Sequence, residues 1–335
     1  MSKQIEFANF ICRFGEKKVL MDLAEEIVLP AFLSDNIRAY GDTRYFFYQT
    51  QLIELQKGTT PILGIAGRFV KDTILEREQV FEEKVGLKRD HQAIRSAPST
   101  IFVLILNNHK LIYLHETANA PNLNAFKATA EKFMMEKYRA YLNKTYDERK
   151  LLEENITKKD MMKDLTEEYP RPTVEIVPLS SESSFEEFIK QYYILRNLQI
   201  RLLQTNNELD MNEFFLQVRD QMDVIGSRQT TLIHNNPEGL SKDEVIKKLS
   251  PVAGQGNAQI SLEGKDAQGD ILKGNNDNFK IKVPIGQVEE NVSGAALQLY
   301  DIFRKLVKRG TLSVSKKYEA SVEKIQALRK HTKKS

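Results

Sequence analysis

Two pairs of residues have the types and spacing of known nuclease chemistry. In the first pair, Arg228 and His234 are separated by five residues. A similar spacing occurs in helical ribonucleases, in which the histidine works as acid or base and the arginine steadies the phosphate. That chemistry needs a helix, whereas the intervening Gln-Thr-Thr-Leu-Ile is rich in residues that favour strands. A strand is the plainer interpretation, and the acid–base nuclease stays an alternative.

Glu263 and Lys265 form the second pair, at the end of an expected strand. A Glu-x-Lys triplet occurs in metal-dependent nucleases, where carboxylates hold Mg²⁺ and the lysine orients a hydroxide. The same triplet arises by chance in lysine-rich chains, and Gly264 between the two residues also suits a turn. Mg²⁺ is expected only under this alternative. The main interpretation has no cofactor and no metal ion, and leaves open whether the protein is an enzyme.

The sequence lacks the motifs of the easily recognised enzyme classes. It contains no GxxxxGK[ST], no GxSxG, no HExxH and no paired CxxC. Its one cysteine, Cys12, cannot form an intramolecular disulfide, which fits a reducing cytoplasm, and it is most simply a buried apolar residue. The longest apolar run, 101–106, is far too short to span a membrane, and the polar first residues lack a signal-peptide core. We expect a cytoplasmic protein without membrane insertion.

Charge is distributed unevenly along the 335 residues. The net charge is +3, but the chain from Arg304 onward carries eleven lysines and arginines against Glu319 and Glu323, which is +9. Subtracting +9 from +3 leaves −6 for residues 1–303. Such asymmetry is typical of a protein whose basic end meets phosphate or another acidic partner.

The basic end therefore supplies the predicted nucleic-acid-binding residues. They are Lys316, Lys317, Lys324, Arg329, Lys330, Lys333 and Lys334. Two other interpretations stay open, because a basic helix can also keep a protein in solution or dock on the acidic body of its own chain or a sister subunit.

The hydrophobic pattern predicts an α+β fold made of two mixed segments. We expect an N-terminal α+β domain over 1–145, a charged helical linker over 146–172, a second α+β domain over 173–290, and amphipathic basic helices over 291–335. In the second domain, strands alternate with helices, as in a split β-α-β or ferredoxin-like unit.

The clearest local element is a hairpin. Residues 100–106 and 111–115 are apolar and rich in β-branched side chains, and Asn107-Asn108 between them suits the positive backbone angles of a tight turn. Length and continuous hydrophobicity predict that the first strand is buried on both faces. A long amphipathic helix is expected to begin near Pro121.

Dispersed positions give the chain a family resemblance. They run from Ala97-Pro98-Ser99-Thr100 through the hairpin to Phe126, and continue with Asn257-Ala258, 263–269 and Val283-Pro284. In these positions the chain resembles an uncharacterised bacterial family, a domain of unknown function associated with mobile elements and phage-defence neighbourhoods. The resemblance implies a setting and supplies no catalytic residue.

Charge and resemblance together predict a nucleic-acid-binding component of a bacterial antiviral defence system. It would sense or hold phage DNA or RNA, as an oligomer or beside a partner effector protein. The alternatives are a toxin-like nuclease built on the pairs above, and a non-enzymatic assembly protein whose basic end grips an acidic partner.

Overall fold

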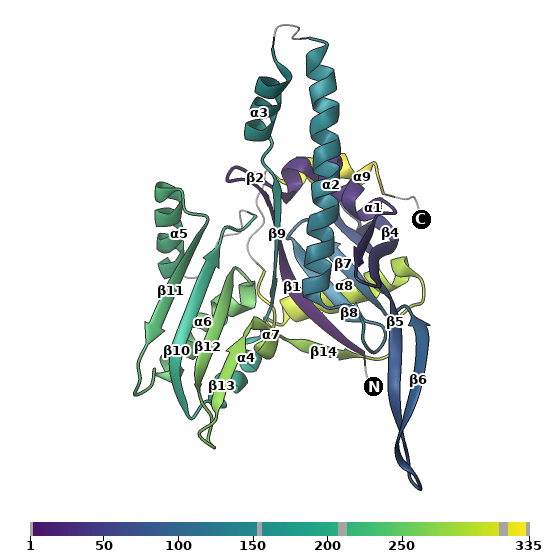
Figure 1. The fold of residues 1–335 in the computed structure, drawn as a ribbon. Coiled ribbons are helices and arrows are strands. Elements are labelled where there is room, and N and C mark those ends of the chain that lie inside the picture. Colours follow the sequence, from purple (N-terminus) through teal and green to yellow (C-terminus); the bar gives the residue numbers. More distant parts are fainter. Residues whose placement is uncertain (1–2, 153–155, 207–212, 315–320, 333–335) are drawn as a thin grey trace.

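Two antiparallel β-sheets organise the protein. The computed structural model describes residues 3–152, 156–206, 213–314 and 321–332. Within these ranges the chain forms a larger sheet and a four-stranded sheet, each covered by helices (Figure 1). The predicted α+β class is confirmed.

The larger sheet takes strands from both halves of the chain. Its strands are β1 (Lys3–Phe14), β2 (Lys18–Val19), β3 (Ile37–Tyr40), β4 (Thr43–Gln56), β5 (Ile62–Glu82), β6 (Gly86–Ser96), β7 (Ser99–Ile105), β8 (Lys110–His115), β9 (Pro172–Pro178) and β14 (Lys282–Ile285). Their order is β14-β1-β8-β7-β5-β4-β3; β2 and β9 also pair with β1, and β6 pairs with β5.

The predicted hairpin is present as β7 and β8, which pair in register from Thr100–His115 to Ile105–Lys110. Residues 100–105 are buried because helices cover both faces of this part of the sheet. The turn differs in detail, since the positive φ falls on His109 (57°). Asn107 instead uses its side chain, which accepts from the Leu63 amide and donates to the Pro61 carbonyl.

Helices lie on both faces of the larger sheet. One face is covered by α2 (Leu123–Lys150), by a helical stretch made of a 3-10 turn (Leu20–Leu23), a π-helical turn (Ala24–Val28) and α1 (Leu29–Leu33), and by α9 (Ser321–Arg329). The other face is covered by α8 (Val292–Lys308), whose small and apolar residues Ala295, Ala296, Leu299 and Phe303 are buried. Asn122 caps α2 by accepting from the Ala125 amide.

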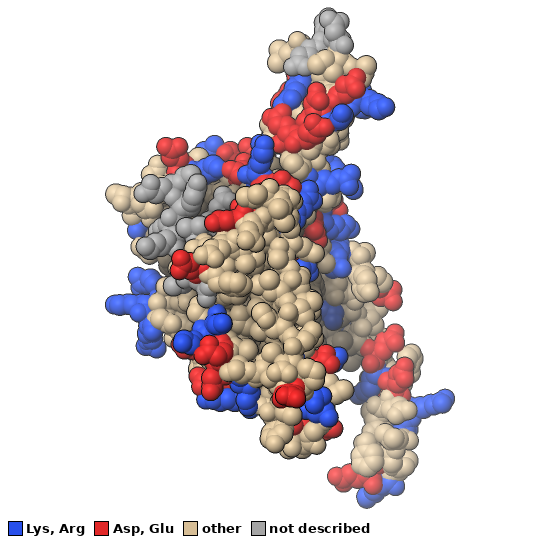
Figure 2. Space-filling model, turned by 90° about the vertical axis from the view of Figure 1, so that its left-hand side faces the viewer, with Lys and Arg blue, Asp and Glu red and all other residues tan. Residues whose placement is uncertain are grey.

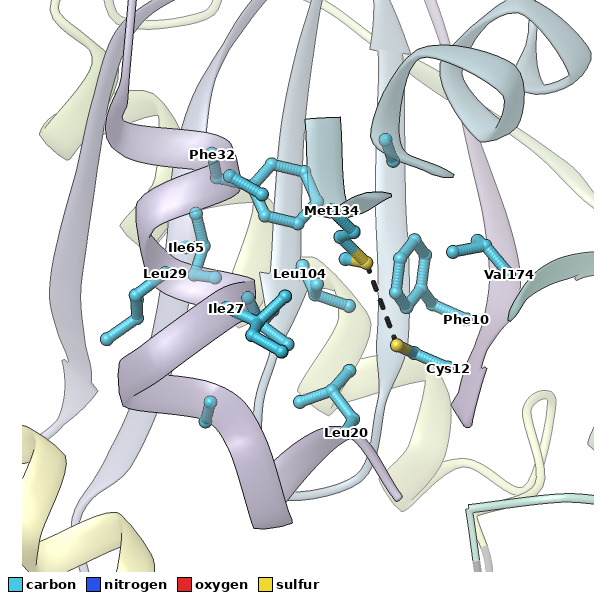
Figure 3. Close-up of a cluster of buried hydrophobic side chains, with 14 of the residues drawn as sticks. Phe10, Cys12, Leu20, Ile27, Leu29, Phe32, Ile65, Leu104, Met134 and Val174 are labelled. Carbon is cyan, nitrogen blue, oxygen red and sulfur yellow. Dashed lines mark hydrogen bonds between the residues drawn. The ribbon is translucent and has the colours of Figure 1, made fainter. Parts of the chain in front are cut away.

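The core beneath α2 is dense in aromatic side chains. Phe126 has no exposed surface, and its ring centroid lies 5.1 Å from that of Phe102 and 5.3 Å from that of Phe69. Figure 3 shows the neighbouring part of this core, where the Cys12 thiol lies 3.7 Å from the Met134 sulfur. Burial raises the pKa of Cys12 far above its ordinary value, so the cysteine acts as a small core residue.

The four-stranded sheet forms the second unit. Its strands are β10 (Ile194–Leu203), β11 (Gln229–Asn235), β12 (Ala258–Lys265) and β13 (Ile271–Asn275), and its helices are α4 (Glu182–Lys190), α5 (Glu213–Ile225), α6 (Lys242–Gln255) and α7 (Asn276–Phe279). The order is β11-β10-β12-β13, with antiparallel pairing throughout. In a split β-α-β unit, a helix joins two parallel strands that have another strand between them, whereas here α5 joins β10 to β11, which are antiparallel neighbours. This sheet therefore differs from the predicted ferredoxin-like arrangement.

The predicted division of the chain at 146–172 also differs from the structure. α2 runs on to Lys150, and α3 (Lys158–Glu168) packs beside it. The next strand, β9, pairs with β1 from Ala8–Pro178 to Phe14–Pro172, so it belongs to the larger sheet. β14 likewise pairs with the start of β1. The second unit is thus inserted between β9 and β14 of the larger sheet. The hydrophobic pattern had assigned both of these strands to the second domain, but both pair with β1.

No helix in the described ranges is long and apolar enough to cross a membrane.

The aromatic core gives a stability prediction. Phe126→Ala should lower the free energy of unfolding by about 3–5 kcal/mol, because it removes a buried ring and leaves a cavity among rings that cannot all move in. Tyr193→Ala is the matched control: its side chain is 72% exposed, and we expect a change within about 0.5 kcal/mol. Urea unfolding followed by circular dichroism measures both, and equal losses in the two variants would contradict this account of the core.

Candidate functional site

A cleft of about 710 Å³ lies where the two sheets meet. Its walls come from β1 and β9 on one side and from β10 and the start of β11 on the other. Most of its lining residues are polar or charged, and Ile11, Pro170 and Leu203 are aliphatic. The full lining is Ile11, Arg13, Gly15, Tyr138, Thr166, Pro170, Arg171, Thr173, Glu175, Arg201, Leu203, Gln204, Arg228 and Gln229.

Strand register places two of the arginines in this cleft. On β1 and β9, Arg13 pairs with Thr173 and Ile11 pairs with Glu175, so these alternate residues share one face. On β10, the core residues Ile200 and Leu202 alternate with Arg201 and Leu203, which therefore point to the opposite face. The polar faces of the two sheets are opposite each other here, and Arg13 and Arg201 therefore line one cleft.

Backbone and amide oxygens accept hydrogen bonds from the guanidinium groups of Arg13 and Arg201. Arg13 donates to the backbone carbonyls of Thr205, Gly15 and Glu16. Arg201 donates to Gln229 Oε1 from Nε at 2.9 Å and to Gln259 Oε1 from Nη1 at 3.2 Å. A carbonyl or amide oxygen fixes the orientation of a guanidinium without cancelling its charge. The amide partners of Arg201 therefore leave its positive charge directed at the cleft.

The described lining of the cleft has more positive than negative side chains. Among its described lining residues there are four arginines and one carboxylate, Glu175. Lys127 forms an ion pair with that carboxylate, and its Nζ lies 2.6 Å from Glu175 Oε2. Within the described part of the chain, Arg228 forms an ion pair with Glu16 alone, at 4.0 Å, and Arg171 forms none. The cleft is consequently suited to an anion.

A buried polar network connects the larger sheet to the end of α6 in the second unit. Lys110 is 1% exposed, and its Nζ donates to Asn9 Oδ1 at 2.9 Å and to the Gln255 carbonyl at 3.0 Å. Asn9 Nδ2 in turn donates to the Gly256 carbonyl and to Asn257 Oδ1. A buried ammonium is tolerated only when hydrogen bonds replace its water. The C-terminal end of α6 is therefore tied to the larger sheet.

A second link comes from Asn206, just after β10. Its Oδ1 accepts from the Cys12 amide at 2.8 Å, and its Nδ2 donates to the Phe10 carbonyl at 2.8 Å. The side chain thus takes the place of a strand neighbour along β1. Ile11, Val177 and Leu203 add an apolar contact between the sheets.

The structure does not bring Arg228 and His234 into one site. The segment between them is strand β11, not the helix that the ribonuclease chemistry needs. Arg228 lines the arginine cleft, whereas His234 lines a separate pocket of about 520 Å³ with Phe214 and Phe215 on the helix-covered face of the sheet.

Glu263 and Lys265 lie on β12, away from the cleft. Glu263 Oε2 is 3.1 Å from Lys273 Nζ on the neighbouring strand, which makes an ordinary cross-strand ion pair. No group of three His, Cys, Asp or Glu side chains suited to a metal ion is found among the residues that the structure describes.

The basic C-terminal end is described in part. Lys316, Lys317, Lys333 and Lys334 lie outside the described residues. The other three predicted contacts lie on α9 or directly after it and are paired with acids of the body: Lys324 with Asp22, Arg329 with Glu54 at 3.0 Å and Lys330 with Glu25 at 3.0 Å. These ion pairs correspond to the docking interpretation, in which the tail lies on the acidic part of its own chain.

The sequence gives little indication that the cleft arginines form a site. Arg13 stands in the otherwise apolar run Phe10–Phe14, where an arginine is unusual for a buried strand. Arg201 occupies a polar position of an alternating strand, and such positions are normally solvent-exposed. Only the contact between the sheets shows that these two residues face the same space.

The surface beside the cleft is sparsely charged. β11 contains no lysine, arginine, aspartate or glutamate. Figure 2, which views the molecule from the β11 side, shows a broad area without charged side chains and clusters of both signs around it. Positive charge on this side of the molecule is therefore concentrated at specific places and is not spread over the sheet.

A scan against protein-family models finds no match for this chain, and a search of curated proteins finds none either.

Docking of α9 should depend on pH. Hydrogen bonds from Lys330 and then His331 hold the pKa of Glu25 below its ordinary value. The stabilisation is therefore present above the unfolded-state pKa of about 4.3, and is lost as the pH falls through the lower folded-state value. Thermal melts of the protein and of Glu25→Gln should differ at pH 7 and converge in strong acid. A difference that persists unchanged down to about pH 2 would contradict the assignment.

Proposed function

We propose that the arginine cleft binds the phosphate backbone of a nucleic acid. The observation that carries this proposal is the concentration of Arg13, Arg171, Arg201 and Arg228 around one cleft, in which the carboxylate of the described lining is already paired. Guanidinium groups are planar, stay charged at all physiological pH values, and match phosphate oxygens through paired hydrogen bonds.

The composition of the cleft supports a charged ligand over an apolar one. Small-molecule pockets are usually lined by hydrophobic and aromatic side chains. Here threonine, glutamine and arginine side chains predominate, and Thr173, Gln204 and Gln229 add neutral groups that can hydrogen-bond to phosphate or sugar. A nucleic acid presents phosphates in series, which suits arginines contributed by four separate segments.

The cleft is a better candidate than α9 for this role. Lys324, Arg329 and Lys330 each have a carboxylate partner, so binding phosphate there would first require breaking an ion pair. Arg201 has amide partners instead and keeps its charge available. The proposed ligand is still a nucleic acid, as predicted from the sequence, but its main binding surface is the arginine cleft and not the basic C-terminal end.

The broader expectations stay predictions. A role in antiviral defence, with phage DNA or RNA as the ligand, depends on the family resemblance and on the uneven charge. Nuclease activity through Glu263 and Lys265, or through His234, and a cytoplasmic location are likewise proposals that activity and localisation measurements would decide.

Arg171→Gln combined with Arg201→Gln should weaken nucleic-acid binding. We expect at least about a tenfold loss at low salt, which corresponds to about 1.4 kcal/mol. The slope of log affinity against log salt should also fall by about 0.7–0.9 for each phosphate that the variant no longer neutralises. Fluorescence anisotropy with labelled single-stranded DNA, single-stranded RNA and duplex DNA, each over a salt series, measures both quantities.

Two matched variants test the location. Arg309→Gln removes one exposed charge at the end of α8, and Lys324→Gln with Arg329→Gln removes charges of α9. Neither should change binding, although the α9 variant should melt at a lower temperature because it loses its ion pairs. The proposal fails if the α9 variant alone abolishes binding, or if the wild-type protein binds inorganic phosphate or nucleotides but no oligonucleotide.

A further inference from the structure

Glu175 is the carboxylate of the described lining of the arginine cleft. Its register partner on β1 is Ile11, and strand alternation puts it on the same face of the larger sheet as Arg13. A carboxylate and a phosphate offer a guanidinium the same kind of paired oxygen acceptors. Glu175 is therefore a group of the chain itself that resembles the proposed ligand of the cleft.

Two neighbours outside the described lining of the cleft contact this carboxylate. Lys127 lies in the second turn of α2, the helix that packs beside β9 (Figure 1), and its Nζ is 2.6 Å from Glu175 Oε2. Gln259 Nε2 donates to the same oxygen at 3.5 Å. The side chains of Lys127 and Glu175 are 30% and 29% exposed, so their ion pair is partly shielded from water and is stronger than a pair on the open surface.

The amide of Gln259 lies between Glu175 and Arg201. Its Oε1 accepts from Arg201 Nη1 at 3.2 Å, while its Nε2 donates to Glu175. Among the described residues, Glu175 forms an ion pair with Lys127 and with no arginine. A lysine that does not line the cleft thus neutralises the carboxylate, and Arg201 keeps its charge for a ligand.

We propose that Lys127 controls the affinity of the arginine cleft for phosphate by neutralising Glu175. This inference rests on the proposed function of the cleft. When Lys127 loses its charge, the negative charge of Glu175 is no longer compensated. The carboxylate then repels a phosphate or pairs with a guanidinium that would otherwise bind one, and either effect lowers the affinity. Lys127 is thus a positioning residue, which acts through Glu175 and does not contact the ligand.

Three variants break the ion pair and differ in the charge that remains. Lys127→Met leaves the carboxylate alone, and we expect it to bind labelled single-stranded DNA at least about threefold more weakly than wild type at low salt. Glu175→Gln leaves the lysine alone and should bind at least as tightly as wild type. The double variant leaves neither charge and should bind within about twofold of wild type. Fluorescence anisotropy measures all three affinities.

This pattern separates the proposal from two simpler roles of Lys127. If the ion pair only held α2 on β9, all three variants would bind more weakly, because each of them breaks it. If Lys127 contacted phosphate itself, the double variant would stay weaker than wild type. Either result would overturn the proposal. Circular dichroism and thermal melts show whether each variant is folded under the conditions of the binding measurement.

Two matched controls test whether the position of the charge matters. Lys127→Arg keeps the positive charge beside Glu175 and should bind within about twofold of wild type. Lys132→Met removes another charge of α2, whose partner is Glu136 on the same helix at 3.8 Å, and should leave the affinity unchanged. An equal loss of affinity in Lys127→Met and Lys132→Met would contradict the proposal, because any positive charge on α2 would then serve.

The wild-type protein and the variant Arg171→Gln with Arg201→Gln distinguish this inference from the proposed function. If the wild-type protein binds no oligonucleotide, the proposed function fails and the role of Lys127 fails with it. If the wild-type protein binds, the arginine variant binds at least about tenfold more weakly and Lys127→Met binds like wild type, the function of the cleft stands and the role of Lys127 alone is overturned.

Discussion

Strand β1 is the constraint on which the rest of the structure depends. Its amides and carbonyls are paired by β8 on one side, by β14 and β9 along the other, and by β2 at its end. Unpaired backbone groups in such a core would cost several kilocalories per mole in total. The chain satisfies them by pairing β1 with three later strands, β8, β9 and β14, which begin at residues 110, 172 and 282. The insertion of the second unit between β9 and β14 follows from that requirement.

The same constraint produces the cleft. Because β9 and β14 pair with the same side of β1, the segment between them must leave the larger sheet and return to it close by, and the second sheet is held beside β1 as a result. Lys110 and Asn206 fix its position through hydrogen bonds to Asn9, to the end of α6 and to the backbone of β1. The polar faces then confront each other over Arg13 and Arg201. Charge gathers here through tertiary packing, since the arginines belong to no continuous basic segment.

Local patterns predicted the elements that depend on local interactions. The hairpin of β7 and β8 follows from two apolar runs and a short polar turn, and α2 from its helical periodicity. The domain boundary and the arrangement of the second sheet could not be predicted, because pairing partners of β1 and β10 are set by long-range contacts. The site was missed for the same reason. Of the cleft arginines, only Arg228 was a candidate site residue from the sequence. It was paired with His234 for ribonuclease chemistry, but β11 lies between the two residues and they line different pockets. The basic residues of α9 were recognised, but the acids that neutralise them lie near the other end of the sequence.

Cys12 gives this architecture a built-in reporter. Its thiol lies near the end of β1, fully buried beside Met134, and its raised pKa keeps it protonated and unreactive in the folded protein. A thiol reagent can reach it only when β1 separates from its neighbours. Since β1 holds strands from the beginning, middle and end of the chain, the labelling rate of this one native cysteine measures the opening of the whole molecule, with no introduced probe.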